Sequence, residues 1–174
     1  MSFTQPLRGV SEGAATLDGL PEWNLSDLYT GMDDPNLARD LTRAADDSAT
    51  FEARWKGKLA DAAGKTGDDG LGAAMRDYEA LDELMGRIGS YAGLLYSSNT
   101  ADPAHGKFYG DIQEKLTDAS AHVLFFTLEL NLVDDQLLEQ ALENDPAFGH
   151  YAPWVTDLRK DRPYQLEDCV EQLF

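Results

Sequence analysis

The chain has three histidines, His105, His122 and His150, and 32 acidic residues, the side chains that most often hold a catalytic metal ion. A zinc site of the H-E-x-x-H type needs two imidazoles one helical turn apart and a glutamate between them that activates the metal-bound water. None of the histidines is followed by Glu, and no two of them lie four positions apart. The sequence therefore predicts no metal ligand at any of its positions.

Asp118 precedes His122 by four positions, a spacing that puts both side chains on one face of a helix. A two-ligand metal site could be built there, but a histidine at the edge of a core more commonly bonds to backbone, carboxylate or water. Paired carboxylates can also act as acid and base, yet with 32 acidic residues such pairs arise by chance. We expect solvated acidic faces and a structural His122.

Three strings resemble nucleophile or phosphate motifs but lack the necessary context. Residues 9–13 read G-V-S-E-G, like a hydrolase nucleophile elbow, without the strand and helix that such a serine requires. Gly64-Lys65-Thr66 resembles the end of a P-loop, but Leu59 stands where the first glycine belongs. Residues 67–72 read G-D-D-G-L-G and place two carboxylates where a pyrophosphate would lie. We predict no catalytic and no cofactor-binding residue.

The last third of the chain has one basic cluster, made of Arg159, Lys160 and Arg162. Arginine beside aromatic rings can bind a carboxylate, such as the C-terminus of a peptide, but it can equally pin two helices through an internal ion pair. We favour the packing role. Three aromatic residues flank the cluster in the sequence: Tyr151, Trp154 and Tyr164.

Composition predicts that the chain folds and excludes some classes of partner. A chain of 174 residues with 43% hydrophobic residues can bury a core, so it should fold. The balance of 32 acidic against 14 basic residues, a formal net charge of -18, repels phosphate backbones and anionic lipid surfaces. We therefore expect no nucleic-acid partner and no membrane partner.

The single cysteine, Cys169, excludes an internal disulfide and a cysteine-based zinc cage, which favours a reducing compartment. The first residues show no basic cluster followed by an apolar stretch, and the longest apolar run is the short segment 123–126. The expected location is the cytoplasm.

Apolar spacing predicts an all-α fold, an antiparallel bundle of long amphipathic helices with shorter C-terminal helices. Residues 1–21 read as a flexible lead-in, and residues 22–174 as one helical domain that opens with large apolar side chains, Trp23 among them, packed on the core. Asp-Pro pairs at 34–35 and 102–103 predict helix starts. The long helices are expected over 35–64, 69–97 and 103–130.

The segment after 125 fits two patterns, because its leucines and phenylalanines at 126, 128, 130 and 132 also alternate as in a strand. The helical spacing upstream favours continuation of the helix. Short helices are expected over 135–143 and 146–160, the second bent at Pro153, and a last one begins after Pro163. Its apolar face, Leu166, Val170, Leu173 and Phe174, predicts a partner, either another subunit or a following domain.

Several strings, in order along the chain, carry a family resemblance. Residues 22–29 read E-W-N-L-S-D-L-Y, residues 51–59 F-E-A-R-W-K-G-K-L, residues 91–96 Y-A-G-L-L-Y, and residues 125–130 F-F-T-L-E-L. The most specific string is the tail, 158–174, with R-P-Y-Q-L and V-E-Q-L-F. Together these resemble oligoendopeptidase F, a branch of the thimet-oligopeptidase-like zinc metallopeptidases. Tyr164 stands where that family often has His.

The resemblance implies a mostly helical cytoplasmic enzyme that hydrolyses short peptides in a deep cleft, with zinc held by H-E-x-x-H and a downstream Glu. Those residues would lie beyond Phe174, in a catalytic domain that this chain lacks. The chain would then be the N-terminal helical wall of the cleft, inactive alone, with the catalytic domain and short peptides as partners. Two alternatives stay open: a stand-alone acidic helical protein-interaction module, and a small-molecule or metal-binding bundle that uses His122 and nearby carboxylates.

Overall fold

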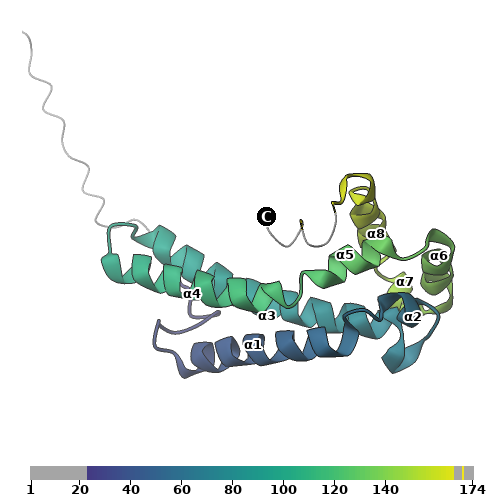
Figure 1. Ribbon diagram of the computed structural model, residues 1–174. Helices are drawn as coiled ribbons and strands as arrows, with labels where there is room; N and C mark the ends of the chain where they lie inside the picture. The colour runs from purple at the N-terminus through teal and green to yellow at the C-terminus, as the bar shows by residue number, and fades with distance from the viewer. Residues whose placement is uncertain (1–22, 167–169, 171–174) are drawn as a thin grey trace, which may run out of the picture.

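The structure is a computed structural model that describes residues 23–166 and residue 170. Within this part every regular element is a helix, so the predicted all-α class is confirmed (Figure 1). The predicted lead-in and most of the predicted last helix lie outside the described residues. The elements are α1 Pro35–Trp55, α2 Leu59–Ala63, η1 Gly67–Asp69, α3 Leu71–Ser98, α4 Pro103–Ala121, α5 Phe125–Leu132, α6 Asp135–Asn144, α7 Pro146–Gly149, α8 Ala152–Arg159 and η2 Arg162–Tyr164.

The long helices α1, α3 and α4 pack on one another, and α2 and the shorter helices α5 to α8 gather at one end of them (Figure 1). Both Asp-Pro starts are confirmed. The carboxylate of Asp34 accepts the N–H of Asn36 at 2.8 Å, and that of Asp102 accepts the N–H of Ala104 at 2.8 Å. Each cap satisfies one of the free amides of a first helical turn, which is worth about 1 kcal/mol.

Two clusters of buried side chains form the core. The first lies under the shorter helices, where the rings of Phe51, Tyr78 and Phe126 pack at centroid distances of 4.7 to 6.4 Å. The second lies between α1, α3, α4 and the segment before α1. Met85 of α3 contacts both clusters, which makes the core continuous. The second cluster comprises Tyr29, Leu37, Ala44, Leu84, Ile88, Tyr91, Ala92 and Ile112.

The entry segment, residues 23–34 before α1, differs from the expectation at one residue. Leu25 and Leu28 pack against the second cluster and Tyr29 is 3% exposed, as predicted for the string that opens the domain. Trp23, by contrast, is 63% exposed. The indole therefore lies at the surface rather than on the core.

The first long helix is shorter than predicted, because α1 ends at Trp55 and the residues up to Ala63 form the separate helix α2. Gly57 between them has φ +76°, a left-handed conformation that an α-helix cannot contain. Glycine adopts it without steric cost, so the chain turns there.

The third long helix is also interrupted, although the segment is helical and not a strand. Helix α4 ends at Ala121, and α5 begins at Phe125 after a turn in which the Leu124 N–H bonds the Ser120 carbonyl at 3.1 Å. Val123, Phe125 and Phe126 are all buried. All three side chains belong to the first cluster of the core.

The expected helix over 146–160 is two helices, α7 and α8, and the break lies at His150–Tyr151 rather than at Pro153. Pro153 occupies the first turn of α8, where its missing N–H has no helical partner to lose. Pro163 lies within the 3₁₀ turn η2, and the two residues after that turn, 165 and 166, are not helical. None of the described helices is long and apolar enough to cross a membrane.

Candidate functional site

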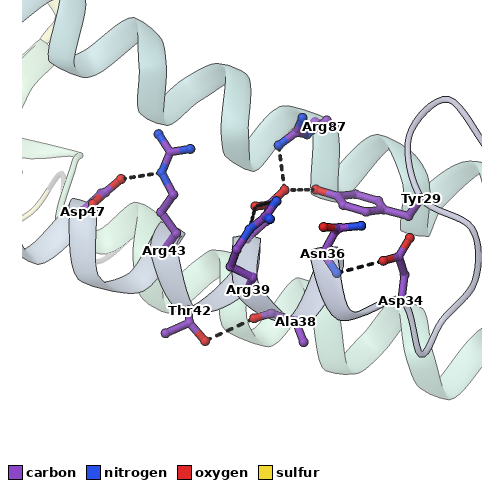
Figure 2. A network of polar contacts seen from close by, with 10 residues as sticks. Tyr29, Asp34, Asn36, Ala38, Arg39, Thr42, Arg43, Asp47 and Arg87 are labelled. Atoms are coloured by element: carbon purple, nitrogen blue, oxygen red, sulfur yellow. Dashed lines mark hydrogen bonds and ion pairs between the residues drawn. The ribbon is translucent and has the colours of Figure 1, made fainter.

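Asp40 is the centre of a buried polar network near the first turns of α1. Its Oδ2 accepts the hydroxyl of Tyr29 at 3.0 Å and the Nη2 of Arg87 at 2.7 Å, and its Oδ1 accepts Arg39 at 3.1 Å. Figure 2 shows Tyr29 and Arg87 converging on the same oxygen from the entry segment and from α3.

Burial raises the pKa of Asp40, but the hydrogen bonds from Arg39 and Tyr29 and the charge of Arg87 outweigh it, so the pKa lies below its ordinary value. A carboxylate that is 2% exposed and bonded on both oxygens has no capacity left for a substrate or a transferable proton. The network therefore holds the entry segment, α1 and α3 together.

None of the sequence motifs predicted this network, although the position of Asp40 in the sequence is a signal for it. Asp40 lies three positions after Leu37 and four before Ala44, on the buried face of α1. A carboxylate on an apolar stripe must find partners or protonate, so its position alone points to a buried ion pair.

An open cavity of about 820 Å³ adjoins the same network. It lies between the entry segment, the last turns of α3, the α3–α4 connection and the start of α4. Two lining residues are Tyr91, which contacts the rings of Tyr29 and Phe108, and His105, whose Nδ1 is buried without a partner among the described residues. The lining residues are Trp23, Asn24, Leu25, Ser26, Tyr29, Thr30, Gly31, Met32, Tyr91, Leu95, Ser97, Ser98, Asn99 and His105.

His122 does not form the pair with Asp118 that its spacing allows. Its Nδ1 lies 2.5 Å from the Oε2 of Glu52 on α1, and Lys56 Nζ binds the other oxygen of Glu52 at 2.6 Å. The hydrogen bonds from His122 and Lys56 hold the pKa of Glu52 below its ordinary value. The structural role expected for His122 is therefore found, with a partner that is distant in the sequence.

The described residues do not form a zinc site. No group of three or more His, Cys, Asp and Glu side chains in this part of the chain could hold a metal ion. His122 is bonded to Glu52, and His150 packs edge-on against Tyr151 at 5.2 Å. The Nε2 of His105 lies 4.0 Å from the carboxylate of Asp102, with no further ligand beside it.

Arg159 has the packing role that the sequence favoured. Its Nη1 donates to the carbonyl oxygens of Leu130 at 3.2 Å, Asn131 at 2.8 Å and Val133 at 2.8 Å, and its Nη2 pairs with Asp135. The C-terminal carbonyls of α5 have no helical donors of their own, so one guanidinium completes that end. Arg162 also binds Asp135, at 2.8 Å, and Lys160 binds Asp157.

The three aromatic residues near this basic cluster do not form a joint binding surface with it. Tyr151 donates to Glu79 at 2.6 Å, Trp154 packs 5.9 Å from the ring of Tyr78, and Tyr164 is 81% exposed. The reading of the cluster as a carboxylate clamp therefore has no support in the described residues.

The glycine strings near residue 67 form the link between α2 and α3, as expected, and not a phosphate loop. Gly67 has φ +71°, and a Cβ on Gly70 would come within 2.7 Å of the carbonyl oxygen of Lys65. Both glycines are required by the turn itself. The serine string at 9–13 lies outside the described residues.

Glu129 of α5 connects that helix to the end of α1. Its two carboxylate oxygens accept the N–H of Gly57 at 2.8 and 2.9 Å, which ties α5 to the turn after α1.

A family model described as Oligopeptidase F matches residues 129–174, from this glutamate to the last residue. No curated protein and no solved structure matches the chain. Residues 129–174 therefore match the N-terminal region of the oligopeptidase F family, which confirms the resemblance for the string at 158–174.

Proposed function

We propose that residues 22–174 form the N-terminal helical domain of a zinc-dependent oligoendopeptidase and build one wall of the cleft that admits short peptides. The family match over 129–174 carries this proposal. The earlier strings, among them E-W-N-L-S-D-L-Y, extend the resemblance to the part of the chain before the match.

The packing of the described helices suits the wall of a cleft. Three long helices, α1, α3 and α4, lie side by side over a continuous core, and Arg159 and Glu129 fasten the shorter helices to one another and to α1 (Figure 1). Close-packed helices hold a fixed surface, which is what the exclusion of folded proteins from a cleft requires.

The chemistry of peptide hydrolysis belongs, in this proposal, to a catalytic domain outside the 174 residues. Residues 23–166 supply no zinc site, so no step of hydrolysis is assigned to them. Exposed leucines at the two ends of α5 offer apolar contacts for such a domain: Leu124, the residue before the helix, is 40% exposed, and Leu132, its last residue, is 56% exposed. We place the protein in the cytoplasm because one cysteine provides no disulfide framework.

The direct test incubates the purified 174-residue protein and zinc with internally quenched fluorescent peptides of five to fifteen residues. The expected result is no cleavage above a buffer blank, with or without a chelator. Cleavage that a chelator abolishes would contradict the proposal. The same test with this chain joined to a catalytic domain should restore zinc-dependent cleavage.

A second candidate is the stand-alone acidic helical interaction module, and the exposed leucines of α5 are the observation that favours it. The two candidates differ in solution. A stable homo-oligomer, measured by light scattering and dissociated by Leu132→Glu, would favour the module. A monomer that binds a separately produced catalytic domain through the same leucines would favour the peptidase domain.

A further inference from the structure

The cavity beside the entry segment has two large apolar side chains in its lining that remain at the surface. Trp23 is 63% exposed and Met32 is 42% exposed. Exposed apolar side chains gathered around a hollow often mark a place where something else packs. The volume of the cavity, about 820 Å³, lies within the range of roughly 300–1,000 Å³ that is usual for sites that hold a bound molecule. The cavity therefore has room for an occupant that covers both side chains.

The lining of this cavity carries no acidic and no basic residue, although the protein as a whole has a formal net charge of -18. None of the described residues that line it is Asp, Glu, Lys or Arg. Its polar side chains are hydroxyl and amide groups, such as those of Ser26, Ser97 and Asn99, which can both donate and accept hydrogen bonds. A charged ligand would find no counter-ion in this lining. A peptide segment suits it better, because its backbone is uncharged and has one donor and one acceptor per residue.

The entry segment brings the chain to the rim of this cavity. The side-chain oxygen of Asn24 accepts the N–H of Ser26 at 3.0 Å, and Leu25 packs against the second cluster of the core, so the backbone next to Trp23 is held in place. Glu22 is bonded to Trp23, and the residues before it therefore start at the cavity. A segment that is tethered beside a site has a high effective concentration there, which favours it over a separate molecule.

Residues 13–21 have a composition that matches this lining. They read G-A-A-T-L-D-G-L-P, with two leucines, Leu17 and Leu20, and one charged side chain, Asp18. From the exposed side chains, the uncharged lining and the point of attachment we infer that residues 13–21, which lie outside the described residues, fill the cavity and that their leucines cover Trp23 and Met32. Nine residues span up to about 30 Å when extended, so their reach is sufficient.

Amide hydrogen exchange of the 174-residue protein, followed by mass spectrometry, distinguishes a docked segment from the flexible lead-in that the sequence predicts. The reference is a synthetic peptide of residues 9–22, in which the same amides are free. In the protein, the amides of residues 14–20 should exchange at least about fivefold more slowly than in the peptide. Exchange at the rate of the peptide would overturn the inference. The proposed peptidase role is not tested by this experiment, because the inference uses only the cavity and the residues next to it.

Two variants change the proposed contact, one from each side, and each has a matched control. Leu20→Asp brings a charge to the uncharged lining, whereas Leu7→Asp makes the same change outside residues 13–21. Met32→Ser removes an exposed apolar side chain from the lining, and Tyr164→Ser removes an exposed ring that is not part of it. Because Met32 and Tyr164 are both at the surface, neither replacement should unfold the protein.

The slowing of exchange at residues 14–20 should fall to less than about a third of its original value in Leu20→Asp and in Met32→Ser, and should stay the same in Leu7→Asp and Tyr164→Ser. Slow exchange that Met32→Ser leaves unchanged would mean that the segment packs elsewhere. Equal losses in the two controls would mean that the contact is not specific to the cavity. Slow exchange that disappears on dilution of the original protein would assign the cavity to the lead-in of a second copy. Each of these three results would overturn the inference.

Discussion

The hydroxyl of Tyr29 donates a hydrogen bond of 3.0 Å to the Oδ2 of Asp40, a carboxylate that is 2% exposed on the buried face of α1. Arg87 of α3 binds the same oxygen at 2.7 Å (Figure 2). One oxygen atom thereby joins the entry segment, α1 and α3, and the stability of this end of the bundle should depend on it.

Tyr29→Phe is expected to destabilise the protein by about 1–2 kcal/mol, because it leaves a buried charged acceptor with one bond fewer. Tyr91→Phe, in the next ring of the same cluster, should change the free energy of unfolding by less than about 0.5 kcal/mol, since its hydroxyl has no described partner. Urea denaturation followed by circular dichroism measures both. Equal losses would contradict the assignment of the bond.

Arg159→Lys should cost about 1–3 kcal/mol, because a lysine cannot reach the three carbonyls at the end of α5 and Asp135 together. Amide hydrogen exchange should become faster in the last turn of α5 and the first turn of α6. Arg162→Lys is the matched control, since Arg162 contacts only Asp135 in this network. Unchanged exchange in Arg159→Lys would show that the guanidinium is dispensable.

The Glu52–His122 contact predicts a pH effect. The pKa of Glu52 is lowered in the folded state by the hydrogen bonds from His122 and Lys56, so the unfolded chain binds more protons around the ordinary value of 4.5. The stabilisation is present above that value and is lost as the pH falls through the lower, folded-state pKa.

Stability curves of the original protein and of Glu52→Gln between about pH 3 and pH 7 should therefore converge as the pH falls. Glu139→Gln changes the same charge on the exposed face of α6 and should give a curve parallel to that of the original protein. A constant difference for Glu52→Gln at every pH would exclude a contribution from the titration of Glu52.

Replacement of glycine by alanine should change the stability of the protein in opposite directions at Gly57 and Gly86. Gly57→Ala forces an alanine to φ +76° and should destabilise the protein by about 1 kcal/mol. Gly86→Ala lies within α3 with nothing within 4 Å of the added carbon, and should stabilise it by about 0.5–1 kcal/mol. Thermal unfolding measures both, and a stabilised Gly57→Ala would show that the turn can adopt another conformation.

The sequence by itself determined the helical class, the starts of α1 and α4, and which faces of the long helices are buried. These follow from interactions within a few residues: an aspartate cap, a proline that needs no N–H, and side chains repeated every three or four positions. The resemblance to the oligopeptidase F family was readable for the same reason, because it lies in short contiguous strings.

Only the tertiary structure decided where the long helices break and which polar groups meet. The turn after Ala121 is followed by Val123, Phe125 and Phe126, which are all buried in one cluster with side chains from other helices. The pairing of His122 with Glu52 and the meeting of Tyr29 and Arg87 at Asp40 likewise depend on atoms brought together from distant positions. The spacing of apolar residues predicts which face of a helix is buried, whereas the burial of a given side chain and the pairing of charges depend on how the helices pack together.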